Sequence, residues 1–358
     1  MTQNISISPT LALQQITMSQ TQNYDGTTVN AFIYENGPEN IDETWFDTAA
    51  YGRAFTYVQL IPGYIYEAEF YNWNWTNTKS VRLGIGIKNT STTSAQVTIL
   101  KKAISKTDKL NPKPSNIIGS DMTVKFMKDT QSTPLSIPAN SGATQGFKDL
   151  LSETIVRSEL VNGRIRFRVD SGTSLYAKIY FVDSTKTDWE KFAGWTNLIS
   201  QADLNRPDSQ KPQTYLSETS YTGVYQNVNR AFTVPNLNPV EIALGQKLNN
   251  KIVDLYNINE FETPSNTLPF VVNGNQGNYG IVYTPYCSVP NAKYFKLTPK
   301  KIATIQRYVI KENGFWKIVD ASQTSPYKGT LTGGTSFWFV LAGGNHGDVE
   351  IQFSTTPF

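Results

Sequence analysis

Histidine and cysteine, the residue types that most often carry chemistry, each occur once in this sequence of 358 residues, as His346 and Cys287. A zinc or copper site needs several His, Cys or carboxylate ligands, and one His with one Cys cannot supply a His₃ or Cys₄ set. His346 lies in the Gly-rich string 343–348, which is typical of an exposed turn, and no Gly-x-Ser-x-Gly elbow accompanies it as a triad base. Cys287 has no basic neighbour that would lower its thiol pKa, so we expect a small buried strand residue. The sequence therefore predicts no catalytic residue, metal site or cofactor, and we expect a protein that is not an enzyme.

The side chains best suited to binding are aromatic residues that alternate with amides after the first long strand. They are Tyr71, Asn72, Trp73, Asn74 and Trp75. A flat ring supplies contact area and an amide fixes orientation, a combination used by sugar-binding faces and by protein contacts. We predict that these five residues form a contact surface at an exposed turn. The alternative is that they are ordinary strand residues that cover an edge of the core.

Three arginines alternate along a second strand candidate, residues 163–169. They are Arg164, Arg166 and Arg168, and they share one face of that strand. A row of three guanidinium groups could bind an anion. We favour the alternative of a solvated strand face, because arginine is rarely fully buried without a partner.

The segment 64–102 shows the clearest strand pattern in the chain. Apolar and polar residues alternate over 64–71, 81–88 and 96–101, and polar turn-forming stretches separate these runs. A period of two is typical of half-buried strands, so we predict an antiparallel β-meander.

The remaining elements follow from local signals. Asn-Gly within 311–314, between two alternating apolar runs, predicts a tight hairpin. The Pro-containing stretch 105–138 predicts a long connection with one short strand near 122–126. We expect short helices at 147–160 and at 187–199, and the latter begins with a capping box.

The length of the chain favours two domains, at roughly 100–200 residues per domain. A polar stretch bounded by prolines gives the best linker candidate. We predict a flexible amino-terminal arm at 1–22, a first β-sandwich at 23–204, a linker at 205–212 and a second β-sandwich at 213–358. The predicted fold class is all-β, with two tandem antiparallel sandwiches of jelly-roll or immunoglobulin-like type and a short linker helix.

Composition excludes some partners and favours others. Charged residues make up 17% of the chain and the net charge is +3, with no long stripe of Lys or Arg, so nucleic acid is not an expected partner. Low charge weakens repulsion between copies and favours association. Residues 1–22 lack the basic and apolar regions of a signal peptide or membrane span, so we expect synthesis in the cytoplasm.

Several Gly- and Asn-centred strings carry a family resemblance that spans about residues 29–355. The strings are 277–283, 327–329 and 333–336 in the second half, with 52–54, 88–90 and 160–163 in the first. This pattern resembles a family of surface-associated proteins from spore-forming Gram-positive bacteria, commonly labelled copper amine oxidase-like. The resemblance implies tandem β-domains and a surface location, although the export signal usual in that family is missing from residues 1–22.

The label of that family does not imply oxidase chemistry for this chain. True copper amine oxidases need three His ligands and a Tyr that becomes a quinone within an Asn-Tyr-Asp/Glu motif. The chain contains Asn23-Tyr24-Asp25, but His346 is its only histidine. Copper therefore has no ligand set, and a turn at Asp25-Gly26 accounts for the string.

These observations together predict a non-enzymatic structural protein that assembles with copies of itself into a surface, spore-associated, parasporal or other crystalline layer. One alternative is a carbohydrate-binding adhesin or toxin-like module that uses Trp73 and Trp75 on a glycan. A second alternative is a viral capsid subunit with two β-domains.

Overall fold

A computed structural model gives the architecture of most of the chain. The described residues are 25–36, 39–46, 52–107, 115–141, 145–186, 221–225, 229–242, 247–248, 251–252, 280–300, 305–345 and 349–358. The expected amino-terminal arm, the helix at 187–199 and the linker at 205–212 lie outside these residues.

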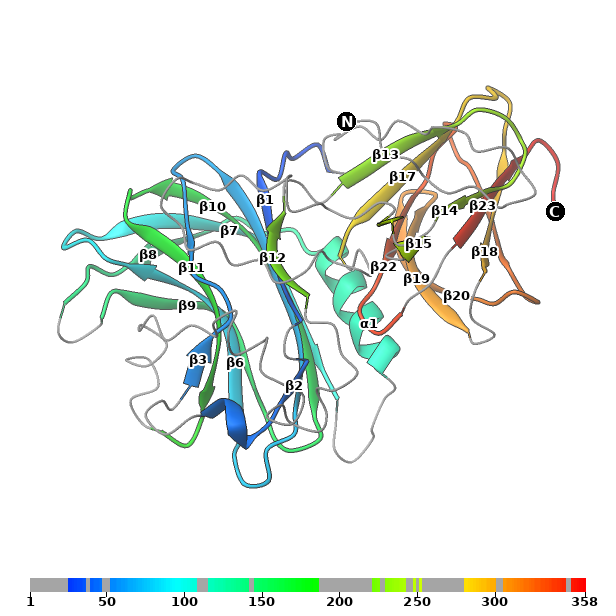
Figure 1. The fold of residues 1–358 in the computed structure, drawn as a ribbon. Coiled ribbons are helices and arrows are strands. Elements are labelled where there is room, and N and C mark those ends of the chain that lie inside the picture. The colour runs from blue at the N-terminus through cyan, green and yellow to red at the C-terminus, as the bar shows by residue number, and fades with distance from the viewer. Residues whose placement is uncertain are drawn as a thin grey trace.

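Two β-sandwiches make up the described part of the chain, which confirms the all-β prediction (Figure 1). In the first sandwich the larger sheet has the strand order β12-β1-β5-β10-β7-β8, with β2 beside β5, and the smaller sheet has the order β3-β11-β6-β9, with β4 beside β11. The bounds of these elements are β1 (Ala31–Asn36), β2 (Asn40–Ile41), β3 (Gly52–Ala54), β4 (Val58–Gln59), β5 (Ile65–Asn74), β6 (Val81–Asn89), β7 (Ala95–Lys106), β8 (Thr133–Ile137), β9 (Phe147–Ile155), β10 (Leu160–Ser171), β11 (Leu175–Asp183) and β12 (Tyr221–Tyr225), with a 3₁₀ turn η1 (Glu43–Phe46).

The second sandwich has the strand orders β13-β17-β22-β19-β20 and β14-β23-β18-β21. Its strands are β13 (Asn229–Val234), β14 (Val240–Ile242), β17 (Val282–Cys287), β18 (Tyr294–Pro299), β19 (Gln306–Glu312), β20 (Phe315–Ala321), β21 (Tyr327–Thr330), β22 (Trp338–Leu341) and β23 (Val349–Ser354), and β15 (Lys247–Leu248) pairs with β16 (Lys251–Ile252). The predicted hairpin joins β19 to β20, with Asn313 and Gly314 at φ 52 and 82°, as a two-residue turn requires.

The predicted meander over 64–102 is wrong in its pairing. Its three strands are present, but β5 and β7 belong to the larger sheet and β6 to the smaller one. The chain therefore crosses the core between consecutive strands. Leu83, Ile85 and Ile87 of β6 bury their side chains in the same core cluster as Ala68 and Phe70 of β5. Alternation identifies a half-buried strand but not its neighbour, which is why the pattern suggested a meander.

Two elements have a different type from the predicted one. Residues 115–128, where we expected a strand near 122–126, form helix α1 (Ser115–Lys128). Its buried Ile118, Met122 and Phe126 recur every four residues, a helical period. The helix expected at 147–160 is instead largely β9, which pairs antiparallel with β6 over eight residue pairs. β9 is the edge strand of the smaller sheet, and its partner β6 is far away in sequence. The local sequence therefore does not reveal this pairing.

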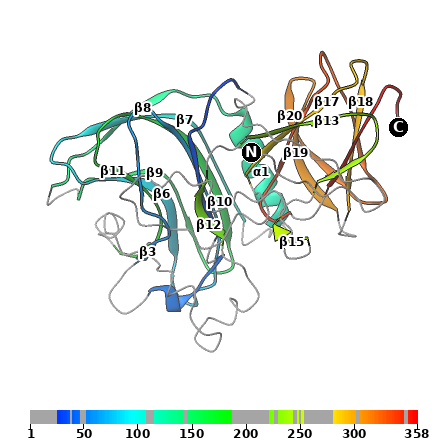
Figure 2. The same ribbon diagram turned by 45° about the horizontal axis from the view of Figure 1, so that its top comes forward.

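Helix α1 lies between the two sandwiches, as both ribbon views show (Figures 1 and 2). Met122 and Phe126 pack in one apolar cluster with Val282, Val309 and Val340 of the second sandwich. Strand β1 also joins the two parts, because it hydrogen-bonds to β5 and β12 while Phe32 and Tyr34 pack into the second core. The two sandwiches are thus joined by apolar packing in addition to the covalent chain.

Candidate functional site

The predicted contact surface is only partly on the surface. Trp75 is 39% exposed and its ring lies 6.3 Å from that of the partly buried Trp73. Tyr71, Asn72 and Asn74 are buried, so their prediction as turn-exposed residues was wrong. The reason is that both faces of β5 are covered: Ala68 and Phe70 on one face pack in the first core, and Tyr71 on the other packs against α1. Only the end of the strand reaches solvent.

The buried members of that set have structural contacts. The Asn74 side-chain amide donates to the carbonyl oxygens of Lys79 and Ile155 at 3.0 Å each, and its oxygen accepts from the Thr76 backbone N–H at 2.9 Å. These bonds hold the connection from β5 to β6. Tyr71 packs against Ile118 of α1, at the junction with the second sandwich.

The most unusual group of side chains in the described structure is a buried ionic cluster, formed by Asp25, Glu67, Glu69, Arg164 and Arg166 together with Lys101. Arg164 and Arg166 are 0% and 1% exposed, so the solvated-face interpretation was wrong for both. They lie on the face of β10 opposite Ile165 and Phe167, which belong to the first core. That face is covered by α1 and the second sandwich instead of water.

Glu67 is the centre of the buried ionic cluster. Its two carboxylate oxygens accept from Nε of Arg164 at 2.8 Å and from Nε of Arg166 at 2.6 Å. Strand pairing imposes this geometry, because Arg166 lies directly opposite Glu67 and Arg164 opposite Glu69 on adjacent strands. Ionised partners strengthen such hydrogen bonds, and burial makes each partner necessary to the other.

Both ends of the buried ionic cluster reach other parts of the chain. Arg166 donates to Asp25 at 2.6 Å, and Lys101 forms an ion pair with the same carboxylate at 3.3 Å. At the other end, Nη1 of Arg164 donates to the backbone carbonyl of Gly280 at 2.8 Å. The Arg164 guanidinium also lies 4.7 Å from the centre of the Phe126 ring on α1. One arginine of the first sandwich therefore contacts both α1 and the second sandwich.

The environment shifts the pKa values of the two glutamates of the cluster in opposite directions. Burial opposes ionisation of Glu67, but Arg164 and Arg166 outweigh it and lower the pKa of this carboxyl. Burial raises the pKa of Glu69, and Arg164 offsets that effect only in part. The pKa of Asp25 is lowered, because Arg166 and Lys101 outweigh its partial burial.

The ion pairs and hydrogen bonds of the cluster connect parts of the fold. Its carboxylates are occupied by guanidinium and ammonium groups, and Phe32 and Phe126 cover Arg164. Within the described ranges no three His, Cys, Asp or Glu side chains are grouped as a metal site, and no helix has the length and apolarity to cross a membrane. Cys287 is buried at the end of β17, as predicted, and burial raises its thiol pKa. His346 lies outside the described residues.

A sequence signal for this cluster did exist. Glu67 and Glu69 alternate on one strand, as Arg164 and Arg166 do on another, so the two patterns are complementary in charge and in spacing. Only the pairing of β5 with β10 turns that complementarity into contacts.

The chain is thus an all-β protein whose two β-sandwiches are joined through a helix and a buried set of ion pairs. No protein-family model matches the chain, and no curated protein matches it significantly. Solved structures with some likeness include the CUB1-EGF-CUB2 domain of human MASP-1/3, at 10% identity, 85% coverage of this chain, 98% of that chain and a TM-score of 0.20. Others are the STIV MCP, at 9% identity, 85% and 95% coverage and a TM-score of 0.15, and an oxalate decarboxylase of Bacillus subtilis, at 10% identity, 87% and 79% coverage and a TM-score of 0.12. Scores this low assign neither a family nor an activity.

Proposed function

We propose that this protein is a non-enzymatic structural subunit that assembles with copies of itself into a surface or spore-associated layer. The observation that supports the proposal is the junction between the sandwiches, where Arg164 and Arg166 are fully buried against Glu67. A subunit of a regular layer needs a fixed orientation between its two domains, so that contacts at both ends fit the lattice. A packed, ion-paired junction makes the subunit rigid in this way. The resemblance to tandem β-domain surface proteins supports the location.

Exposed apolar side chains supply candidate contacts between copies. Phe315 is 76% exposed at the start of β20, which is the last strand of its sheet. Trp75, 39% exposed, lies beside Trp73 at the end of β5 in the other sandwich. Single exposed apolar residues are common, but aromatic residues at a sheet edge and at a strand end are suited to protein contacts.

The test is assembly of the purified full-length protein, followed by sedimentation over a range of concentrations and by electron microscopy. We expect regular sheets, fibres or crystals, and we expect the double variant Phe315→Ser, Trp75→Ser to shift assembly to higher concentration. The variant Thr92→Ser, in the exposed turn after β6, is the matched surface control and should assemble like the parent. A protein that stays monomeric at every concentration contradicts the proposal, and assembly unchanged in the double variant contradicts the contacts assigned to Phe315 and Trp75.

A further inference from the structure

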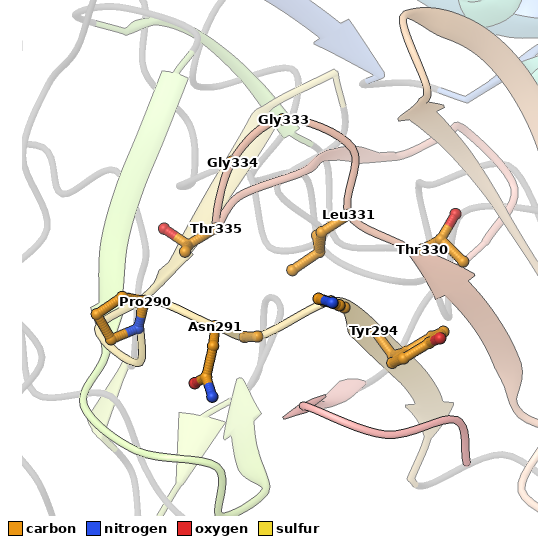
Figure 3. A pocket seen from close by; sticks show the side chains of 10 residues that line it. Pro290, Asn291, Tyr294, Thr330, Leu331, Gly333, Gly334 and Thr335 are labelled. Atoms are coloured by element: carbon orange, nitrogen blue, oxygen red, sulfur yellow. The ribbon is translucent and has the colours of Figure 1, made fainter.

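A pocket of about 410 Å³ lies at one end of the second sandwich, between the segment before β18 and the loop that follows β21 (Figure 3). Its walls are Pro290, Asn291, Ala292, Lys293, Tyr294, Thr330, Leu331, Gly333, Gly334 and Thr335. Figure 3 shows the loop with Leu331 and Thr335 on one side and Pro290 and Asn291 on the other. Its size is within the range of small-molecule sites, about 300–1,000 Å³.

Backbone hydrogen bonds fix both walls of this pocket. The Leu331 N–H donates to the Lys293 carbonyl at 2.8 Å, and the Cys287 N–H donates to the Thr335 carbonyl at 2.7 Å. Tyr294 and Thr330 are also paired across β18 and β21. The pocket therefore belongs to the sheet framework, and a ligand would find its shape already formed.

Lys293 differs from five other lysines of the second sandwich, which have partners. Lys296 lies over the Phe358 ring, Lys300 pairs with Glu350, Lys311 lies over Trp338, Lys317 pairs with Glu312 and Lys328 donates to the Phe358 carbonyl. The Lys293 ammonium is exposed and has no ion pair, hydrogen bond or ring contact with any described residue. No carboxylate lines the pocket, so its one charge is positive.

The remaining lining groups can donate to oxygen atoms or cover a ring. Gly333 has a φ of 74°, and a Cβ added at Gly333 or Gly334 would meet nothing within 4 Å, so this part of the wall is backbone with open space beside it. The Asn291 amide and the Thr335 hydroxyl add polar groups, whereas Leu331 and the Tyr294 ring supply apolar surface. Hydrogen-bond donors beside a ring and one cation match a sugar that carries an acid group.

We propose that this pocket binds a carboxylate-bearing sugar residue, of the hexuronic acid or sialic acid class. Lys293 pairs with the carboxylate, the Gly333 and Gly334 amides and Asn291 bind ring oxygens and hydroxyls, and Tyr294 covers the apolar face of the ring. The site does not depend on self-assembly, and it gives a subunit of a layer a means to hold an acidic glycan.

The test is titration calorimetry of the full-length protein with methyl glucuronide, a methyl sialoside and uncharged methyl glucoside. We expect one of the two acids to bind and the glucoside to bind at least about tenfold more weakly, because the glucoside lacks the charged partner of Lys293. Binding should weaken as salt rises. The two acids distinguish the two classes of sugar.

Variants localise the binding. Lys293→Gln should lower the affinity for the acid about tenfold and leave the glucoside unaffected, and Tyr294→Ala should weaken both ligands. Lys296→Gln, which makes the same change of charge three residues further on in β18, should bind like the parent. The proposal is overturned if neither acid binds in the millimolar range, if Lys293→Gln binds like the parent, or if Lys296→Gln loses as much affinity as Lys293→Gln.

Discussion

Glu67 shows how strongly one buried carboxylate can depend on its neighbours. It is 0% exposed and accepts from two arginines that are also buried. Removing water from these charges is costly, and the mutual hydrogen bonds offset that cost only while all partners are present. Charge at this position therefore matters more for stability than charge in an exposed ion pair.

Replacing Glu67 tests this dependence. Glu67→Gln removes the carboxylate that the two arginines share, which leaves Arg164 with Glu69 and Arg166 with Asp25. We expect a loss of roughly 3–5 kcal/mol of unfolding free energy in urea titrations. The matched control is Arg168→Gln on β10, the strand of Arg164 and Arg166, whose pair with Asp170 is half-exposed. We expect a change within about 0.5 kcal/mol for the control. Equal effects from the two variants would contradict a special role for burial.

Lys178 makes stability depend on pH. Burial, with a smaller effect from Lys88, lowers the pKa of this lysine to about 7. The unfolded chain holds the proton up to the usual lysine pKa of roughly 10.4, so between the two values it binds more protons than the folded chain, and stability rises with pH. Between pH 7 and 9 we expect a gain of about 2 kcal/mol from this group. In paired urea titrations the Lys178→Met variant should lack that gain, and an equal gain in both proteins would refute the assignment.

At the scale of elements, helix α1 shows where local sequence was an insufficient guide. Its recurrence of Ile118, Met122 and Phe126 was present in the sequence, but nearby prolines drew the prediction toward a short strand. β9 shows the opposite error, because its pairing with β6 overrides a sequence that suggested a helix. The strands of the opening segment were predicted, yet their distribution over two sheets depends on contacts far away in sequence.

Gly119 tests how closely α1 packs on the second sandwich. A Cβ at this position would lie 2.1 Å from the carbonyl oxygen of Gly343, which is backbone and cannot rotate away. Alanine normally stabilises a helix over glycine by about 1 kcal/mol, but the clash should exceed that gain. We expect Gly119→Ala to lower the melting temperature and to speed proteolysis between the sandwiches. The control Lys128→Ala, exposed at the end of α1, should do neither.

At the scale of the whole molecule, the site was harder to predict than the fold. Composition and alternation identified an all-β chain with exposed tryptophan at Trp75. The burial of Arg164 and Arg166 could not be predicted, because it depends on α1 and the second sandwich covering a face that a single sandwich would expose to water. A pattern within one strand carries no information on what packs against it.

That shared face should make the two sandwiches unfold together. Chains of this length with two domains commonly melt in separate steps, unless the contact between the domains is large and well packed. Here Phe32 of β1 packs in the second core, and Arg164 binds the Gly280 carbonyl at 2.8 Å. We expect calorimetry of the parent protein to show one transition whose calorimetric and van't Hoff enthalpies agree.

Arg164→Lys should separate the two steps. Lysine keeps the charge, but it lacks the guanidinium fork that binds Glu67, Glu69 and the Gly280 carbonyl at once. The matched control Arg168→Lys changes a half-exposed arginine on the same strand and should retain the single transition. Two transitions in the parent would show that the sandwiches are independent. A single transition in Arg164→Lys, at the parent melting temperature, would show that the apolar contacts of Phe32 and α1 suffice without the ion pairs.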